Sequence, residues 1–123
     1  MNTVVQTTET FREHLARLSP TDQARVKQSV KRLADLFMSN RQAFYQRVTR
    51  PMAPKLKGGF HSSLYVARAG LKLRIILAAD DDPLFDRSIV TLIAVTRHEE
   101  SRKAFETAAK WLYSTRLEGL TKS

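Results

Sequence analysis

The chain has 123 residues, no cysteine and a formal net charge of +9 at pH 7. This length is enough for one hydrophobic core and too short for two ordinary domains, so we expect residues 1–123 to form a single domain. The lack of cysteine excludes disulfides, thiolate metal sites and cysteine nucleophiles. No apolar run approaches the roughly 20 residues that span a membrane, and the first residues do not resemble a signal peptide, so we expect a cytoplasmic protein without membrane contact.

The positive charge is concentrated in the middle of the chain. Residues 37–79 contain no Asp or Glu, and we call this stretch the acid-free segment. Such one-sided charge favours a phosphate-rich or acidic partner, and nucleic acid is our first expectation. The cations of the acid-free segment are Arg41, Arg47, Arg50, Lys55, Lys57, Arg68, Lys72 and Arg74.

The first third of the chain predicts a short strand and two helices. Residues 3–6 are the strand candidate, and Thr10 with Glu13 three residues later forms a capping-box pattern that predicts a helix start. Ser19 followed by Pro20 predicts a second start. Residues 20–37 then carry an apolar stripe at helical spacing, and we expect the two helices to form an antiparallel hairpin. The cations beside that stripe are more typical of a solvated helix face.

The second half predicts three strands and a helix. Residues 64–68, 71–79 and 88–96 are the strand candidates, with Asp80 to Pro83 as the turn before the last strand. Residues 88–96 are apolar on both faces, which is typical of a central strand. A final helix from Ser101 could cover the sheet. We therefore expect an α+β fold in which an N-terminal helical hairpin packs on a small antiparallel sheet, with a C-terminal helix and a basic concavity.

Three cation-bearing segments could meet in such a fold, namely residues 55–59, 67–74 and 95–101. Metal-independent RNA cleavage needs a base for the 2′-OH proton, cations for the charged phosphorane and an acid for the leaving 5′ oxygen. A guanidinium can clamp phosphate, and an imidazole titrates near neutrality. We therefore predict that Arg74, Arg97 and His98 are catalytic. Four further cations are predicted to bind RNA: Lys55, Lys57, Arg68 and Lys72.

Each predicted site residue also has an ordinary alternative. Outward cations are often only solvated, and a histidine at a strand end is often a surface residue or a hydrogen-bonded structural one. Asp80, Asp81 and Asp82 are more typical of a turn than of a metal site, because no other ligand lies at a recognisable spacing. We expect neither a metal nor a cofactor.

Several short motifs occur in a characteristic order over residues 3–110. They are FxxxLxxLSP at residues 11–20, LKG at residues 56–58, the pattern Leu64-Tyr65 followed by Arg68 and Arg74, and a final apolar strand that leads into residues 97–105. In these motifs the chain resembles the RelE/ParE superfamily of bacterial toxin–antitoxin toxins. The resemblance implies a toxin held inactive by a cognate antitoxin. Some members cut mRNA in the ribosomal A site through attack of the 2′-OH, and others bind DNA gyrase without nuclease activity.

The resemblance to the nuclease members has two departures. Leu64 and Val66 occupy positions where these nucleases often carry lysines, and residues 104–105 lie where a catalytic tyrosine would be sought. Arg74 matches the substrate-binding arginine of the family, and His98 lies near the position of a second catalytic arginine. The resemblance implies a ribosome-dependent mRNA endoribonuclease, or mRNA interferase. The alternatives are a gyrase-binding toxin of the ParE kind and an inactive RelE-fold binding protein.

Overall fold

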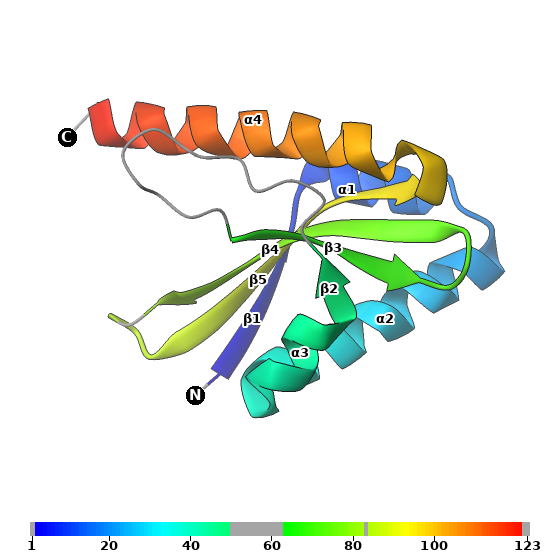
Figure 1. Cartoon of the computed structure of the whole chain (residues 1–123), viewed down its shortest axis with the longest axis horizontal. Coiled ribbons are helices and arrows are strands. Elements are labelled where there is room, and N and C mark those ends of the chain that lie inside the picture. Colours follow the sequence, from blue (N-terminus) through cyan, green and yellow to red (C-terminus); the bar gives the residue numbers. More distant parts are fainter. Residues whose placement is uncertain (1, 50–62, 83, 122–123) are drawn as a thin grey trace.

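The fold is α+β, as the sequence predicts, and its helices lie around one central sheet (Figure 1). The computed structural model describes residues 2–49, 63–82 and 84–121. Among the helices of these residues, none is both long and apolar enough to cross a membrane. In chain order the elements are β1 (Asn2–Thr7), α1 (Glu9–Ala16), α2 (Pro20–Ser39), α3 (Arg41–Arg47), β2 (Val48–Thr49), β3 (Leu64–Ala69), β4 (Leu73–Asp82), β5 (Arg87–Arg97), the 3-10 helix η1 (His98–Glu100) and α4 (Ser101–Thr121).

The sheet has five strands in the order β1-β5-β4-β3-β2. β3, β4 and β5 form the antiparallel meander that the sequence predicts. β1 adds to it as a parallel neighbour of β5, so the sheet is mixed rather than wholly antiparallel. A parallel neighbour requires a long crossover, and the helices between β1 and β5 provide it. β5 is therefore a central strand, which accounts for its apolar residues on both faces.

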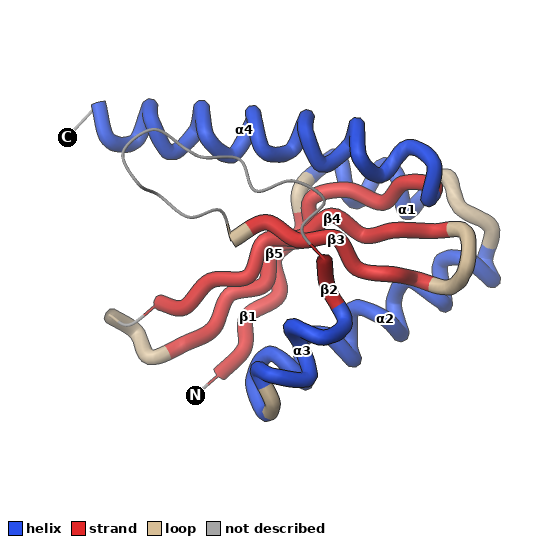
Figure 2. Tube along the Cα trace, viewed as in Figure 1, coloured by secondary structure: helices blue, strands red, loops and turns tan. Residues whose placement is uncertain are grey.

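Helices cover both faces of the sheet (Figure 2). α1, α2 and α3 pack on one face, where Phe11, Phe37 and Phe44 are buried. α4 packs on the other face through Phe105 and Ala108. Burial of one large apolar side chain stabilises the fold by about 1.5–3 kcal/mol, so each helix is held mainly by these contacts. The face opposite the helical hairpin is thus partly covered by α4, and a basic concavity can form only beyond its contact area.

The first helix begins earlier than the capping-box pattern predicts. Thr8, not Thr10, is its N-cap, and the Thr8 hydroxyl oxygen accepts from the backbone N–H of Phe11 at 3.0 Å. The same hydroxyl donates to the carbonyl of Ile93 in β5 at 2.8 Å. This tertiary contact selects Thr8 over the local signal at Thr10. The second prediction is confirmed, because the hydroxyl of Ser19 caps α2.

β4 continues through the residues that we expected to form a turn. Asp80 and Asp81 pair with residues 88–89 of β5, and the turn lies at residues 84–86, where Asp86 has a positive φ of 51°. The turn prediction was wrong because Asp81 has a partner far away in the sequence. Arg41, at the start of α3, donates to both of its carboxylate oxygens. Neither α3 nor the two-residue β2 was predicted.

The turn between β3 and β4 lies at residues 70–72, with Gly70 at a φ of 79°. Glycine adopts this left-handed conformation without steric cost. β4 accordingly begins at Leu73, and Leu71 is 82% exposed instead of joining the apolar row of that strand.

Candidate nucleic-acid interface

Arg68 and Arg74 lie directly opposite each other on β3 and β4. Side chains alternate between the two faces of a strand. Arg68 therefore shares a face with Val66, and Arg74 shares it with Ile76, and both of these apolar residues belong to the core under α4. The hairpin register thus brings two guanidinium groups together on the α4 face, just beyond the part that the helix covers.

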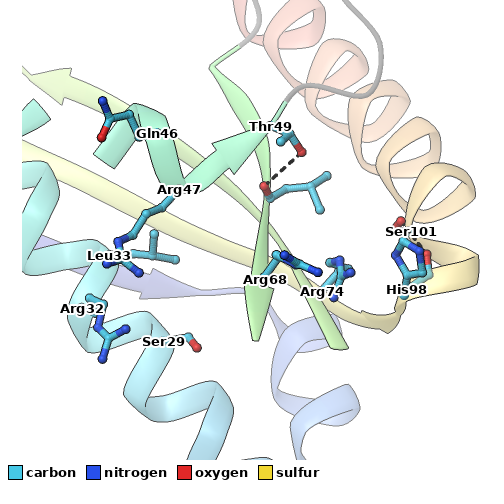
Figure 3. Close-up of a pocket in the computed structure, with 11 residues that line it drawn as sticks. Ser29, Arg32, Leu33, Gln46, Arg47, Thr49, Arg68, Arg74, His98 and Ser101 are labelled. Carbon is cyan, nitrogen blue, oxygen red and sulfur yellow. Dashed lines mark hydrogen bonds between the residues drawn. The ribbon is translucent and has the colours of Figure 1, made fainter. Parts of the chain in front are cut away.

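A pocket of about 540 Å³ opens beside this pair (Figure 3). Arg68, Arg74 and His98 line one part of it, and Arg32 and Arg47 line the other. β4 pairs with β3 along its whole length, but on the opposite side β2 pairs only with residues 66–67, so within the described residues the end of β3 has no strand on that outer side. The pocket crosses the sheet at this uncovered edge, because its lining includes residues of α2 as well as the start of α4.

Arg74 is held firmly although it carries a charge. Its side chain is only 7% exposed, and Nη1 donates to the carbonyls of Leu73 at 2.8 Å, Gly70 at 3.3 Å and Leu71 at 3.4 Å. Burial, together with the nearby charge of Arg68, lowers the pKa of Arg74 from its ordinary value. Guanidinium groups nevertheless stay protonated in proteins. Arg74 is therefore buried, in contrast to the solvated outward cation that was its ordinary alternative.

Within the described residues, the arginine pair has no acidic partner. Among the described residues, the ion pairs join Arg41 to Asp81 and Arg102 to Glu106, and no Asp or Glu lines the pocket. Two like charges directly opposite each other on a sheet are destabilising. An anionic ligand would remove this cost, and a phosphate suits two adjacent guanidinium groups because each can donate two hydrogen bonds to it.

His98 lies on the far side of Arg74 from α2 (Figure 3). Its backbone N–H donates to the carbonyl of Lys72 at 2.8 Å, and its own carbonyl accepts from the hydroxyl of Ser101 at 2.7 Å. These bonds fix the backbone of η1 against the β3–β4 turn. The imidazole is therefore presented to the same pocket as Arg74 by a well-anchored segment.

The other predicted site residues do not join this pocket. Arg97 pairs with Leu73, whose side chain faces α1 and α2, and Arg97 lies with Lys72 in a second cavity of about 820 Å³. Asp22 and Glu99 also line that cavity, so its charge is mixed. Residues 55 and 57, where we predicted RNA-binding lysines, lie outside the described residues. The structure thus unites Arg68, Arg74 and His98 and separates them from Arg97 and Lys72.

The sequence analysis missed the basic residues of the helices. Arg32 belongs to the cations that we interpreted as a solvated face of α2, and Arg47 ends α3, which was not predicted. Arg25 also approaches the site, since its Cδ would lie 3.6 Å from a Cβ atom placed on Gly70. Arg25 and Arg32 are seven residues apart and so share one side of the helix. That spacing is the one sequence signal that could have pointed to a basic ridge.

No protein-family model and no curated protein matches the chain. Among solved structures, the chain is similar to a chain from the crystal structure of the RelBE2 toxin–antitoxin complex of Mycobacterium tuberculosis. The two are 21% identical over 80% of this chain and all of that one, with a TM-score of 0.48.

Proposed function

We propose that this protein is the toxin of a type II toxin–antitoxin system and acts as a ribosome-dependent mRNA endoribonuclease. The proposal rests first on the resemblance of its motifs to the RelE/ParE superfamily. The observation that carries it is the position of Arg68 and Arg74 beside His98, with no acidic partner for either arginine among the described residues. Such a preorganised pair of cations can stabilise charge that develops on a phosphate during reaction.

The proposed reaction is a transesterification at phosphorus. The 2′-oxygen loses its proton to a base and forms a bond to phosphorus, and the bond from phosphorus to the 5′-oxygen breaks as that oxygen gains a proton. Arg74, held by the turn carbonyls, and Arg68 would neutralise the extra charge of the phosphorane. His98 would accept or donate one of the two protons. The proposed partners are mRNA on the ribosome and a cognate antitoxin protein.

The test is expression of the protein alone, with Arg74→Ala and His98→Ala as variants. Loss of one charge-stabilising or proton-transferring group commonly slows a reaction by about 10²-fold or more, so each variant should relieve growth arrest. Primer extension on translated mRNA should show discrete cuts with the wild type only. Lys27→Ala, on the exposed side of α2, is the matched control and should cut normally. Circular dichroism must show that every variant is folded.

One observation favours a second candidate, a toxin that binds DNA gyrase without cleaving RNA. Cleavage needs both a base and an acid, yet His98 is the one imidazole among the described residues that line the pocket, and no Asp or Glu lines it. The same experiment separates the two functions. If folded Arg74→Ala and His98→Ala remain toxic and mRNA stays intact while DNA supercoiling changes, the nuclease proposal is wrong and gyrase binding replaces it.

A further inference from the structure

The half of the pocket formed by α2 and α3 has cations that the proposed cleavage step does not use. Arg32 and Arg47 line it, and both side chains are exposed. Neither forms an ion pair within the described part of the chain, and no acidic residue lines the pocket. Arg47 can be explained by the negative end of the α3 dipole, but Arg32 lies in the interior of α2, where that explanation does not apply.

These cations lie across the sheet edge from the Arg68–Arg74 pair. In Figure 3, Arg32 and Arg47 lie on the α2 side of β3, and Arg74 and His98 lie on the other side. Because the two groups of cations lie on opposite sides of β3, the arrangement suits a ligand with several phosphates in a row. A flexible single strand can follow a recessed path over the edge. An A-form duplex is recognised instead across its shallow minor groove, on a broad outer surface.

An aromatic surface adjoins the same end of the pocket. Tyr45 is 49% exposed, and its ring is packed 5.4 Å from that of Phe44 and 5.9 Å from that of Tyr65, centroid to centroid. Thr49 lines both the basic pocket and the shallow depression beside Tyr45. Single-stranded nucleic acid is typically bound by a basic groove together with exposed aromatic rings on which bases stack.

We propose that the α2–α3 side of the pocket binds a single-stranded RNA segment adjacent to the cleaved bond, with Arg32 and Arg47 on its phosphates and Tyr45 stacked on a base. This inference rests on the proposed nuclease function and assigns its substrate a path along the protein. The phosphate contacts and the stacking contact make different, separately measurable contributions.

The test measures binding of short, labelled, 2′-O-methylated single-stranded RNA, which lacks the attacking hydroxyl, at several salt concentrations. For single strands, each phosphate contact contributes about 0.7 to the slope of log affinity against log salt. Arg32→Ala with Arg47→Ala should therefore lower the slope by about 1.4. Lys27→Ala with Lys31→Ala removes the same charge from exposed positions of α2 that do not line the pocket and should leave the slope unchanged.

Tyr45→Ala should weaken binding by about 5-fold to 150-fold at an unchanged salt slope, because stacking of one base contributes about 1–3 kcal/mol. Tyr45→Phe keeps the ring and should bind like the wild type. Two results would overturn this inference: equal changes in salt slope for both double variants, or unchanged affinity of a folded Tyr45→Ala protein. The proposed function would still stand if the wild-type protein cleaves mRNA. If the wild-type protein neither cleaves nor binds RNA, both this inference and the proposed nuclease function are wrong.

Discussion

Arg68 is expected to reduce the stability of the fold that carries it. It lies directly opposite Arg74 with no acidic neighbour among the described residues, and its charge contributes to the lowered pKa of Arg74. Arg68→Gln removes this repulsion, so it should raise the free energy of unfolding by a few tenths of a kcal/mol. The gain should be seen in urea denaturation at low salt and should shrink at high salt, where the charges are screened.

The matched control for Arg68→Gln is Lys27→Gln, which removes one exposed charge from α2. It should leave stability within about 0.5 kcal/mol of the wild type. A clear loss of stability in Arg68→Gln would mean that this guanidinium has a structural partner after all. Lower stability in exchange for a binding site is common at functional positions.

Asp81 links stability to pH through Arg41. Its carboxylate accepts from both Nη atoms of Arg41 and from the hydroxyl of Ser88, and the bond to Arg41 is the main reason why the pKa of Asp81 lies below its ordinary 3.8. A group with a depressed folded-state pKa adds stability above its unfolded pKa, and this is lost as pH falls through the folded value. The Asp81 side chain is 54% exposed, so solvent screening limits the contribution to about 1 kcal/mol or less.

The expected outcome is that Asp81→Asn is less stable than the wild type at pH 7 and that this difference narrows as pH falls below 3.8. Denaturation curves of both proteins across that range provide the measurement. If the stability difference stays constant with pH, Asp81→Asn destabilises the protein for a reason other than the loss of the carboxylate charge.

At the scale of elements, the sequence predicted those helices and strands that are determined by contacts between residues close together in the chain. The start of α2 at Ser19 follows from capping, and the meander of residues 64–96 follows from the hydrophobic patterns of its strands, although the turn between β4 and β5 was misplaced. α3 could not be predicted in this way, because it is short and Arg41 anchors it to Asp81, forty positions further on. The start of α1 was misplaced for a similar reason, since Thr8 bonds to β5.

The candidate site shows the same division. The sequence indicates the hairpin that carries Arg68 and Arg74, but strand candidates 64–68 and 71–79 leave only residues 69–70 for its turn. The direct opposition of the two arginines follows from the observed turn at residues 70–72. The approach of Arg32 depends on how α2 packs over the sheet edge, and no local pattern contains that information. Arg97 ends β5, whereas His98 begins η1, and the two neighbours therefore line different cavities.

Thr8 connects α1 to the sheet, so its substitution should weaken both the helix and its attachment to β5. Thr8→Val loses the cap of the Phe11 N–H and the hydrogen bond to the Ile93 carbonyl, so we expect a loss of about 1–2 kcal/mol in the free energy of unfolding. Thr10→Val is the control with the same chemical change. Thr10 lies exposed in the first turn of α1, and its substitution should cost less than about 0.5 kcal/mol. Equal losses of stability in Thr8→Val and Thr10→Val would support Thr10 as the N-cap, as the sequence predicted.

At the scale of the whole molecule, the net charge of +9 and the acid-free basic pocket constrain the proposed antitoxin. An inhibitor that covers the pocket must not leave its guanidinium groups buried and unpaired, because uncompensated charge in an interface costs several kcal/mol. We therefore expect an acidic antitoxin segment to lie across β3 and to exclude RNA. Purified complex should not bind single-stranded RNA that the free protein binds.

The position of this interface can be tested by charge reversal, because the β3–β4 turn separates two cavities with different cations. Arg68 lines the pocket with Arg74, and Lys72 lines the cavity on the hairpin side. Both side chains are exposed, so neither reversal should disturb the core. Arg68→Glu should weaken the co-purified complex at least tenfold, since it places a carboxylate against an acidic segment. Lys72→Glu should weaken it far less. The reverse order would move the antitoxin to the hairpin side of the sheet and leave the Arg68–Arg74 pocket open to RNA in the complex.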